Sequence, residues 1–474
     1  MKASQSARMG KGVVERSITW VIMLGAASLF AFQATISSQS PSAATTVTRA
    51  QDPGPRQDAM AAGGPLAGLT PQQAEYFNAG KTDFAEAEEV DEGIGPRMNL
   101  DSCGGCHAQP AVGGTSPAVN PQVAFATLNG GKDTLPSFLT ANGPVREVRF
   151  VRNADGTPDG GVHAIFTING RTGAASCAIP QPDFATAVKN NNAIFRIPTP
   201  TFGLGLVEQI PDSAILANRA ASAAAKNQLG IRGRANFAVA GRTVSGQTNN
   251  NGNDGTVARF GWKAQNKSLL IFAGEAYNVE MGITNDLFMT EREEMASCQF
   301  SAMPNSITDM DATDPVASMS SIEKFATFMR LLAPPAPSTT APGGAASITN
   351  GKALFQSAGC ALCHTPSFTT SASRIAALSN KPVNLFSDLL VHDMGVGLAD
   401  GVSQGSANGR EFRTAPLWGL GQRLFFLHDG RASDLVTAIR AHASVGSEAN
   451  VSVANYLFLS ERQKQDLLNF LRSL

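Results

Sequence analysis

The pattern C-x-x-C-H occurs twice in the chain, as C-G-G-C-H at residues 103–107 and as C-A-L-C-H at residues 360–364. Two thiols three positions apart can each form a thioether with a haem vinyl group, and the adjoining histidine can bind the iron. A thioredoxin-like dithiol or a zinc site would explain one C-x-x-C, but not a histidine after both pairs in a chain with six histidines. The motifs therefore predict two covalently attached c-type haems. The predicted attachment residues and iron ligands are Cys103, Cys106, His107, Cys360, Cys363 and His364.

Composition limits the classes of protein to which the chain can belong. Its 474 residues suggest two or three domains of roughly 150 residues each. Because 37 basic residues nearly balance 38 acidic ones, bulk electrostatics give no sign of a nucleic-acid partner. Only 16% of the residues are charged, and 46 glycines and 26 prolines favour loops and turns. We therefore expect a loop-rich protein that does not bind nucleic acid.

The N-terminus has the pattern of an export signal. Four basic residues precede residues 18–34, which are uncharged and mostly apolar. This apolar length lies between a signal-peptide core and a bilayer span of about 20 residues, so we expect cleavage, with retention as an anchor as the alternative. After the signal at 1–36, residues 37–69 are rich in Ser, Thr, Ala, Gly and Pro, which predicts a flexible linker. The sequence thus predicts a periplasmic location, with anchoring to the inner membrane as the second case.

Helical patterns accompany both haem motifs. Residues 347–359 form a predicted amphipathic helix that leads into the second motif. Residues 460–474 have apolar side chains at helical spacing, with Ser460 as the N-cap, and residues 320–332 repeat this closing pattern after the first motif. A helix, a haem motif and a closing helix make up a cytochrome c module, so the chain should contain two of them.

The Pro/Gly-rich stretch at 333–345 sets the predicted domain boundary. We predict a mainly α protein with two cytochrome c-like domains in tandem, at 70–332 and 346–474. The first is enlarged by a long insertion of strands and loops, which an enzyme pocket needs and a simple electron carrier does not. The predicted strands lie at 145–152, 163–169 and 268–272.

Two cysteines lie outside the haem motifs. In an oxidising compartment Cys177 and Cys298 are expected to form a structural disulfide. The alternative is a pair of free, buried thiols.

Several blocks of the sequence resemble one known family. The chain resembles the di-haem oxidoreductases related to the bacterial di-haem cytochrome c peroxidases and to MauG, over roughly residues 75 to 474. The resemblance implies a peroxidase-like oxidoreductase and, as in related enzymes, a calcium ion between the domains. The matching blocks, in the order expected for the family, lie at 101–114, 200–212, 259–264, 280–284, 387–395, 412–421 and 426–431.

The resemblance also implies the sixth ligand of the second haem. In the related peroxidases this ligand is a methionine on a helix after the H-D-G segment, and in MauG it is a tyrosine. The equivalent position in A-I-R-A-H at 438–442 is His442, which predicts bis-histidine ligation and a lower potential than Met/His ligation gives. The alternatives are Met394 as the ligand and a solvent-facing His442.

Other polar residues are expected near the second haem. His392 and His428 should pack or form hydrogen bonds beside it. Arg413 and Arg431 are candidates to pair with the haem propionates, and a solvated surface position is the alternative for each.

The first haem lacks an evident distal ligand, because His163 lies in a strand-like run and is expected to be an ordinary half-buried histidine. An open iron position can bind peroxide or dioxygen, and cleavage of the O–O bond needs a nearby acid/base. We expect Glu208 in this role, with Gln209 as a hydrogen-bonding pocket residue; a loop glutamate on the surface is the alternative. Glu280 and Glu275 are the next candidates.

Electron transfer between the haems should use an aromatic residue. Of the tryptophans outside the signal, Trp262 is the expected relay and Trp418 is the other; an ordinary core position is the alternative for Trp262. A small donor protein or a small-molecule reductant would reduce the second haem, and peroxide or dioxygen would react at the first. The alternative functions are a pure electron-transfer cytochrome and a MauG-like or oxygenase-like enzyme that oxidises an organic or protein substrate.

Overall fold

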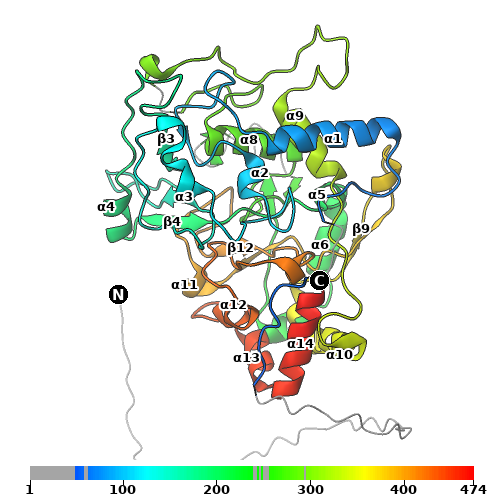
Figure 1. The fold of residues 1–474 in the computed structure, drawn as a ribbon. Helices are drawn as coiled ribbons and strands as arrows, with labels where there is room; N and C mark the ends of the chain where they lie inside the picture. Colours follow the sequence, from blue (N-terminus) through cyan, green and yellow to red (C-terminus); the bar gives the residue numbers. More distant parts are fainter. Residues whose placement is uncertain (1–48, 58–61, 239–242, 245–246, 249–255, 293–294) are drawn as a thin grey trace, which may run out of the picture. The chain divides into compact units, whose positions relative to one another are not determined.

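The computed structural model describes residues 49–57, 62–238, 243–244, 247–248, 256–292 and 295–474 (Figure 1). The predicted export signal at 1–36 lies outside these residues. The described residues belong to one compact unit. No helix in the described residues combines the length and the apolar character that a membrane span needs.

Two pairs of helices repeat the same arrangement. Helix α1 (Pro71–Ala85) packs against α9 (Ser321–Leu331), and α10 (Gly344–Ser357) packs against α14 (Glu461–Ser473). The two helices of each pair approach closely at a glycine. A Cβ on Gly80 would lie 2.3 Å from the Lys324 carbonyl oxygen, and a Cβ on Gly351 would lie 2.0 Å from the Asp466 carbonyl oxygen, so neither position has room for a larger side chain. The helices predicted at 320–332, 347–359 and 460–474 are confirmed.

Capping explains where the last helix begins. The Ser460 hydroxyl accepts a hydrogen bond from the Gln463 backbone N–H, and the Gln463 side chain accepts one from the Ser460 N–H. This reciprocal capping satisfies two N–H groups that a helix start leaves without partners. The predicted N-cap at Ser460 is therefore confirmed.

Apart from helix α8, the other regular elements are short. The remaining helices are α2 (Cys103–Cys106), α3 (Gln122–Phe125), α4 (Phe184–Lys189), α5 (Leu204–Glu208), α6 (Asp212–Ala220), α7 (Ala223–Leu229), α8 (Leu269–Met281), α11 (Gly395–Leu398), α12 (Leu435–Ala441) and α13 (Asn450–Phe458). The described strands form antiparallel two-stranded sheets. The pairs are β1 (Arg97–Met98) with β3 (Phe166–Thr167), β2 (Glu147–Phe150) with β4 (Ala193–Arg196), β5 (Asn236–Ala238) with β8 (Thr256–Ala258), β6 (Thr243–Val244) with β7 (Gln247–Thr248), β9 (Phe368–Thr369) with β10 (Pro382–Val383), and β11 (Val391–Asp393) with β12 (Glu411–Arg413).

The structure confirms a mainly helical chain but corrects one strand. Strands β2 and β3 fall inside the segments predicted at 145–152 and 163–169. The strand predicted at 268–272 is wrong, because these residues begin helix α8, which Ser268 caps through the Leu270 N–H. Most of α8 is buried, and a short apolar run does not distinguish a buried helix from a buried strand.

Buried apolar side chains form two main cores. The first gathers α1, α8 and α9 and includes Phe77, Tyr277 and Phe328. The second gathers α10, α13 and α14 and includes Phe355 and Phe470. The first core also takes in several side chains that follow the predicted linker at 333–345: Phe368, Leu378, Val383, Leu385, Leu389, Leu390 and Trp418.

Part of the predicted N-terminal linker is fixed to the body of the protein. The Asp52 carboxylate accepts hydrogen bonds of 2.6 and 2.7 Å from the Arg472 guanidinium, and both side chains are buried. The Leu66 N–H donates to the Leu331 carbonyl oxygen over 2.7 Å. The expectation of a flexible linker is therefore wrong for the described part of 37–69, because a Ser/Gly/Pro-rich composition does not reveal single anchoring residues.

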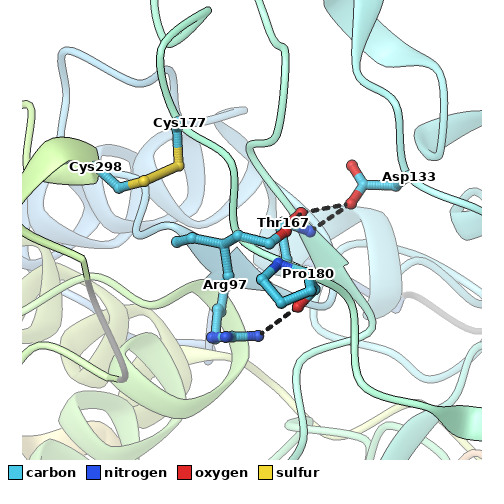
Figure 2. Close-up of a disulfide and its surroundings, with 7 residues drawn as sticks. Arg97, Asp133, Thr167, Cys177, Pro180 and Cys298 are labelled. Carbon is cyan, nitrogen blue, oxygen red and sulfur yellow. Dashed lines mark hydrogen bonds between the residues drawn. A yellow bond between two sulfur atoms is a disulfide. The ribbon is translucent and has the colours of Figure 1, made fainter.

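Cys177 and Cys298 form a disulfide, as predicted (Figure 2). Both cysteines are buried, at 1% and 2% exposure. The bond ties the loop after β3 to the segment after α8, across 121 residues of sequence. Close to it, the Thr167 N–H and hydroxyl both donate to the Asp133 carboxylate, at 2.7 and 2.8 Å.

Replacing both Cys177 and Cys298 by serine should lower the free energy of unfolding by about 2–5 kcal/mol. The long closed loop restricts the unfolded chain, so its loss favours unfolding. Urea titration of the holoprotein followed by circular dichroism measures the change. The control is the wild type under reducing conditions, which should match the variant. An unchanged midpoint in the double variant would show that the bond does not stabilise the fold.

Candidate functional site

The first C-x-x-C-H motif lines a cavity with about 1140 Å³ of unfilled space. Cys103 and Cys106 occupy the single turn of α2, one turn apart, so their thiols lie on the same side. The glycines between them allow close packing, because a Cβ on Gly104 would lie 2.8 Å from the Ala85 Cα at the end of α1. The cavity walls come mainly from α8, α9, β2 and the chain after β4.

The second motif lines a cavity with about 1420 Å³ of unfilled space. Cys360, Cys363 and His364 follow α10 directly. None of the four motif cysteines forms a disulfide, so all are available for thioether bonds. A phenylalanine flanks each motif histidine: Phe84 lies 5.8 Å from His107 and Phe355 lies 6.1 Å from His364, between ring centroids.

Both motif histidines are oriented to bind iron. His107 Nδ1 donates to the Gly114 carbonyl oxygen over 2.9 Å, and His364 Nδ1 donates to that of Phe386 over 3.0 Å. A hydrogen bond from Nδ1 to a carbonyl leaves Nε2 as the free ligand atom. Burial lowers the pKa of each histidine to about 4, so both rings are neutral as a metal ligand must be.

His442 shares this arrangement in the second cavity. Its Nδ1 donates to the Ala438 carbonyl oxygen over 2.7 Å, which leaves Nε2 without a partner in the described residues. Burial lowers the pKa of His442. His442 is also close enough to His364 to depress the pKa of that ring, after the larger effect of burial. Met394, the alternative ligand, lines the same cavity. The lining of the cavity therefore does not decide whether His442 or Met394 binds the iron.

His392 and His428 also line this cavity, and each ring contacts neighbouring side chains. His392 donates from both ring nitrogens to carboxylates, since Nε2 lies 2.9 Å from Asp388 Oδ2 and Nδ1 lies 2.7 Å from Glu448 Oε2. His428 stacks on Phe412 with ring centroids 4.2 Å apart. His392 is therefore a hydrogen-bonding residue of the cavity wall and His428 is a packing residue, as the sequence predicts.

Two buried arginines make the second cavity strongly cationic. Arg413 and Arg423 both line it, and neither forms an ion pair with a carboxylate in the described residues. Burial lowers the pKa of each to about 10, and Arg423 lowers that of Arg413 further. Two neighbouring guanidinium groups without counter-ions fit the propionates of haem. Arg431 does not line the cavity; it binds Asp429 at 2.5 Å on a partly exposed surface.

A pair of carboxyl groups faces the first cavity. Glu280, on α8, and Glu147, on β2, both line it and form a hydrogen bond to each other. Burial and then the charge of Glu147 raise the pKa of Glu280 well above its ordinary value. Burial opposes ionisation of Glu147 as well, but Arg149 holds its pKa below the ordinary value. Of the two carboxyl groups, Glu280 is therefore the one that binds a proton more readily.

Glu208 does not line the first cavity, which contradicts the acid/base role expected of it. Its carboxylate accepts from Arg330 Nε at 2.7 Å and from the Leu269 N–H at 2.8 Å, at the start of α8. Gln209 is also outside the cavity lining, and its carbonyl oxygen accepts from Ser371. Glu208 therefore joins Arg330 of α9 to the start of α8, and Gln209 joins the end of α5 to Ser371. The lower-ranked candidates Glu280 and Glu275 are the ones that face the cavity.

Trp262 lies between the two cavities. It is the tryptophan that lines both, and its Nε1–H donates to the Ile197 carbonyl oxygen over 2.9 Å. Its ring meets that of His428 edge-on, with centroids 6.4 Å apart. Trp418 lines neither cavity and belongs to the first core.

His163 takes an ordinary position, as expected. Its Nε2 lies 2.7 Å from Asp159 Oδ2, and its ring stacks on Phe150 outside the first cavity. Among the residues that the structure describes, no group of three or more His, Cys, Asp or Glu side chains is arranged to bind a metal ion, so the calcium expectation has no candidate site there.

Two cavities, each with a C-x-x-C-H motif and a neutral histidine aimed inward, define a protein that holds two haem groups and works as an oxidoreductase. The chain belongs to the family described as "Di-haem oxidoreductase, putative peroxidase", whose model matches residues 175–474. No curated protein matches the sequence.

Solved structures show only a distant similarity. The diheme peroxidase BthA from Burkholderia thailandensis is 15% identical over 46% of this chain and 65% of that chain, with a TM-score of 0.27. Hydrazine synthase from Kuenenia stuttgartiensis is 19% identical over 34% of this chain and 56% of that chain, with a TM-score of 0.22. The chain thus spans less than two thirds of either relative.

Proposed function

We propose that the chain is a periplasmic, c-type di-haem oxidoreductase that reduces peroxide to water. Electrons pass from the haem on Cys360 and Cys363 to the haem on Cys103 and Cys106. The observation that carries this proposal is the difference between the cavities: the first is lined by a hydrogen-bonded pair of carboxyl groups, Glu147 and Glu280, and the second is lined by the imidazole of His442.

The carboxyl pair supplies the proton chemistry. A haem held by Cys103, Cys106 and His107 would supply the electrons that cleave the O–O bond. Asn99 Nδ2 donates to Glu280 Oε2, so the proton of Glu280 is held on Oε1. From there Glu280 gives a proton to the oxygen that leaves as water, and Glu147, ionised beside Arg149, accepts the proton that the other oxygen loses.

Trp262 is the proposed electron relay. It lines both cavities, and its hydrogen bond to Ile197 fixes the ring in the wall between them. The Ile197 N–H in turn donates to the His428 carbonyl oxygen over 2.8 Å, which ties the same wall to the second cavity.

The second cavity is the proposed electron-storage site. His364 and His442 would bind its iron, and Arg413 and Arg423 would bind its propionates. Thioether attachment and the Cys177–Cys298 disulfide both suit an oxidising compartment, which supports the periplasmic location. The domain division at 333–345 and the cleavage of the N-terminal signal, with its retention as a membrane anchor as the alternative, are part of this proposal.

The electron paramagnetic resonance and optical spectra of the holoprotein, before and after one equivalent of peroxide, test the function. We expect one high-spin and one low-spin haem, a reaction with peroxide, and rapid turnover with an electron donor. Two low-spin haems that are inert to peroxide would instead establish an electron-transfer cytochrome. A peroxide product that persists without donor turnover would establish oxidation of an organic or protein substrate.

A further inference from the structure

A third hollow, with a volume of about 430 Å³, lies beside the second haem cavity. It is formed by α6, α7, the chain that follows α7 and the segment that leads into β11. The size falls within the roughly 300–1,000 Å³ typical of small-molecule pockets. The function proposed above assigns this hollow no role.

The rim of the hollow is cationic. Arg219, Lys226 and Arg232 line it against one carboxylate, Asp388. Lys226 Nζ donates to the Asn218 and Arg219 carbonyl oxygens at 2.6 and 3.2 Å, which fixes it at the end of α6. Arg219 and Arg232 are exposed and form no ion pair with any carboxylate of the described chain.

The carboxylates near the hollow are already occupied. Asp388 Oδ2 lies 2.9 Å from His392 Nε2, and its Oδ1 accepts from the Leu390 N–H at 3.0 Å. Glu448, on the inner side, accepts from the Arg232 N–H at 2.8 Å as well as from His392. Arg219 Nε donates to the Gly233 carbonyl oxygen over 3.0 Å, but no carboxylate of the described chain neutralises Arg219 or Arg232, so both guanidinium charges suit an anion.

His392 separates the hollow from the second haem cavity. It lines both spaces, and its Nδ1 lies 3.7 Å from Cys363 Sγ. The Asp388 N–H also donates to the Cys363 carbonyl oxygen over 2.9 Å, which fixes the two segments together. A molecule in the hollow is thus one imidazole ring away from the sulfur that the haem would bond.

We propose that this hollow binds a small organic anion that serves as the electron donor of the second haem. The inference deepens the proposed function and rests on it. Each bound anion gives up one electron and releases one proton to water. The electron enters through His392 and Cys363 and reduces the ferric iron of that haem to ferrous. Ascorbate, an anionic enediol at neutral pH, has this chemistry and is the probe for the test.

The test compares reduction of the second haem in the wild type and in an Arg219→Gln/Arg232→Gln variant by stopped-flow absorbance. Ascorbate and the cationic reductant hexaammineruthenium(II) are used in parallel at low salt. We expect the ascorbate rate to saturate with concentration in the wild type. It should fall about 10-fold or more in the variant, because the charges that attract and bind the anion are gone. The ruthenium rate should not fall.

An Arg152→Gln/Lys189→Gln variant is the matched control, since it removes the same charge from exposed residues outside the hollow. An equal loss in this control, or an equal loss with the ruthenium complex, would overturn the proposal. An unchanged ascorbate rate in the Arg219→Gln/Arg232→Gln variant would also overturn the proposal. The electron donor, such as an acidic protein, would then bind at another surface. Reaction of the pre-reduced wild type with peroxide is measured separately, so failure of the peroxidase function is distinguishable.

Discussion

Replacing Glu280 by glutamine should slow the reaction of the reduced holoprotein with peroxide by about 10²-fold or more, within the range that general acid–base catalysis provides. An amide cannot give a proton to the leaving oxygen. It can still accept the hydrogen bond from Asn99 Nδ2, so the position of α8 beside the chain that follows β1 should be retained. Stopped-flow absorbance with hydrogen peroxide measures the rate, and the spectra before mixing should match those of the wild type.

Two matched variants locate the effect. Glu275→Gln changes a second carboxyl of the same cavity, which Asn266 binds, and should slow the reaction far less because Glu280, not Glu275, is the proposed proton donor. Glu208→Gln should leave the peroxide rate unchanged and lower the unfolding midpoint, because Glu208 joins Arg330 to the start of α8. A slow Glu208→Gln variant beside a fast Glu280→Gln variant would restore the assignment made from sequence.

Replacing His442 by alanine should convert the second haem alone from low spin to high spin. The neutral imidazole, with Nδ1 bound to Ala438, offers Nε2 to the iron, and alanine offers nothing in its place. His442→Met should keep the haem low-spin and raise its midpoint potential, since thioether ligation favours the ferrous state and axial ligands set haem potentials over roughly 0.8 V. Electron paramagnetic resonance and spectroelectrochemistry measure the two effects.

Met394→Ala is the control, because Met394 lines the same cavity. It should leave the spin state and the potential of the second haem unchanged. A high-spin signal in Met394→Ala, together with an unchanged His442→Ala spectrum, would make Met394 the ligand.

Local patterns predicted the parts of the molecule that depend on neighbouring residues. The helices at the two closing positions and the Ser460 cap follow from helical spacing and capping chemistry. One further signal was present but missed: G-K-x-x-F occurs at 80–84 and again at 351–355. In both copies the glycine permits the helix crossing and the phenylalanine flanks the motif histidine.

The catalytic candidates depend on contacts between distant segments, which spacing does not reveal. Glu280 was identifiable as a glutamate in a family block, but its partner Glu147 lies 133 positions earlier in an ordinary strand. Glu208 is also a glutamate in a family block, as Glu280 is, yet its carboxylate faces Arg330. Only the three-dimensional packing separates a carboxyl that holds a proton from one that forms an ion pair.

The two unpaired arginines of the second cavity bear on how the protein is made. A chain that closed around this space without its prosthetic group would bury the mutually repelling guanidinium groups of Arg413 and Arg423. The haem carboxylates remove that penalty when they arrive. Maturation and compaction of the C-terminal half should therefore be one coupled event, in which the unfilled precursor stays open to the attachment machinery until the prosthetic group is in place.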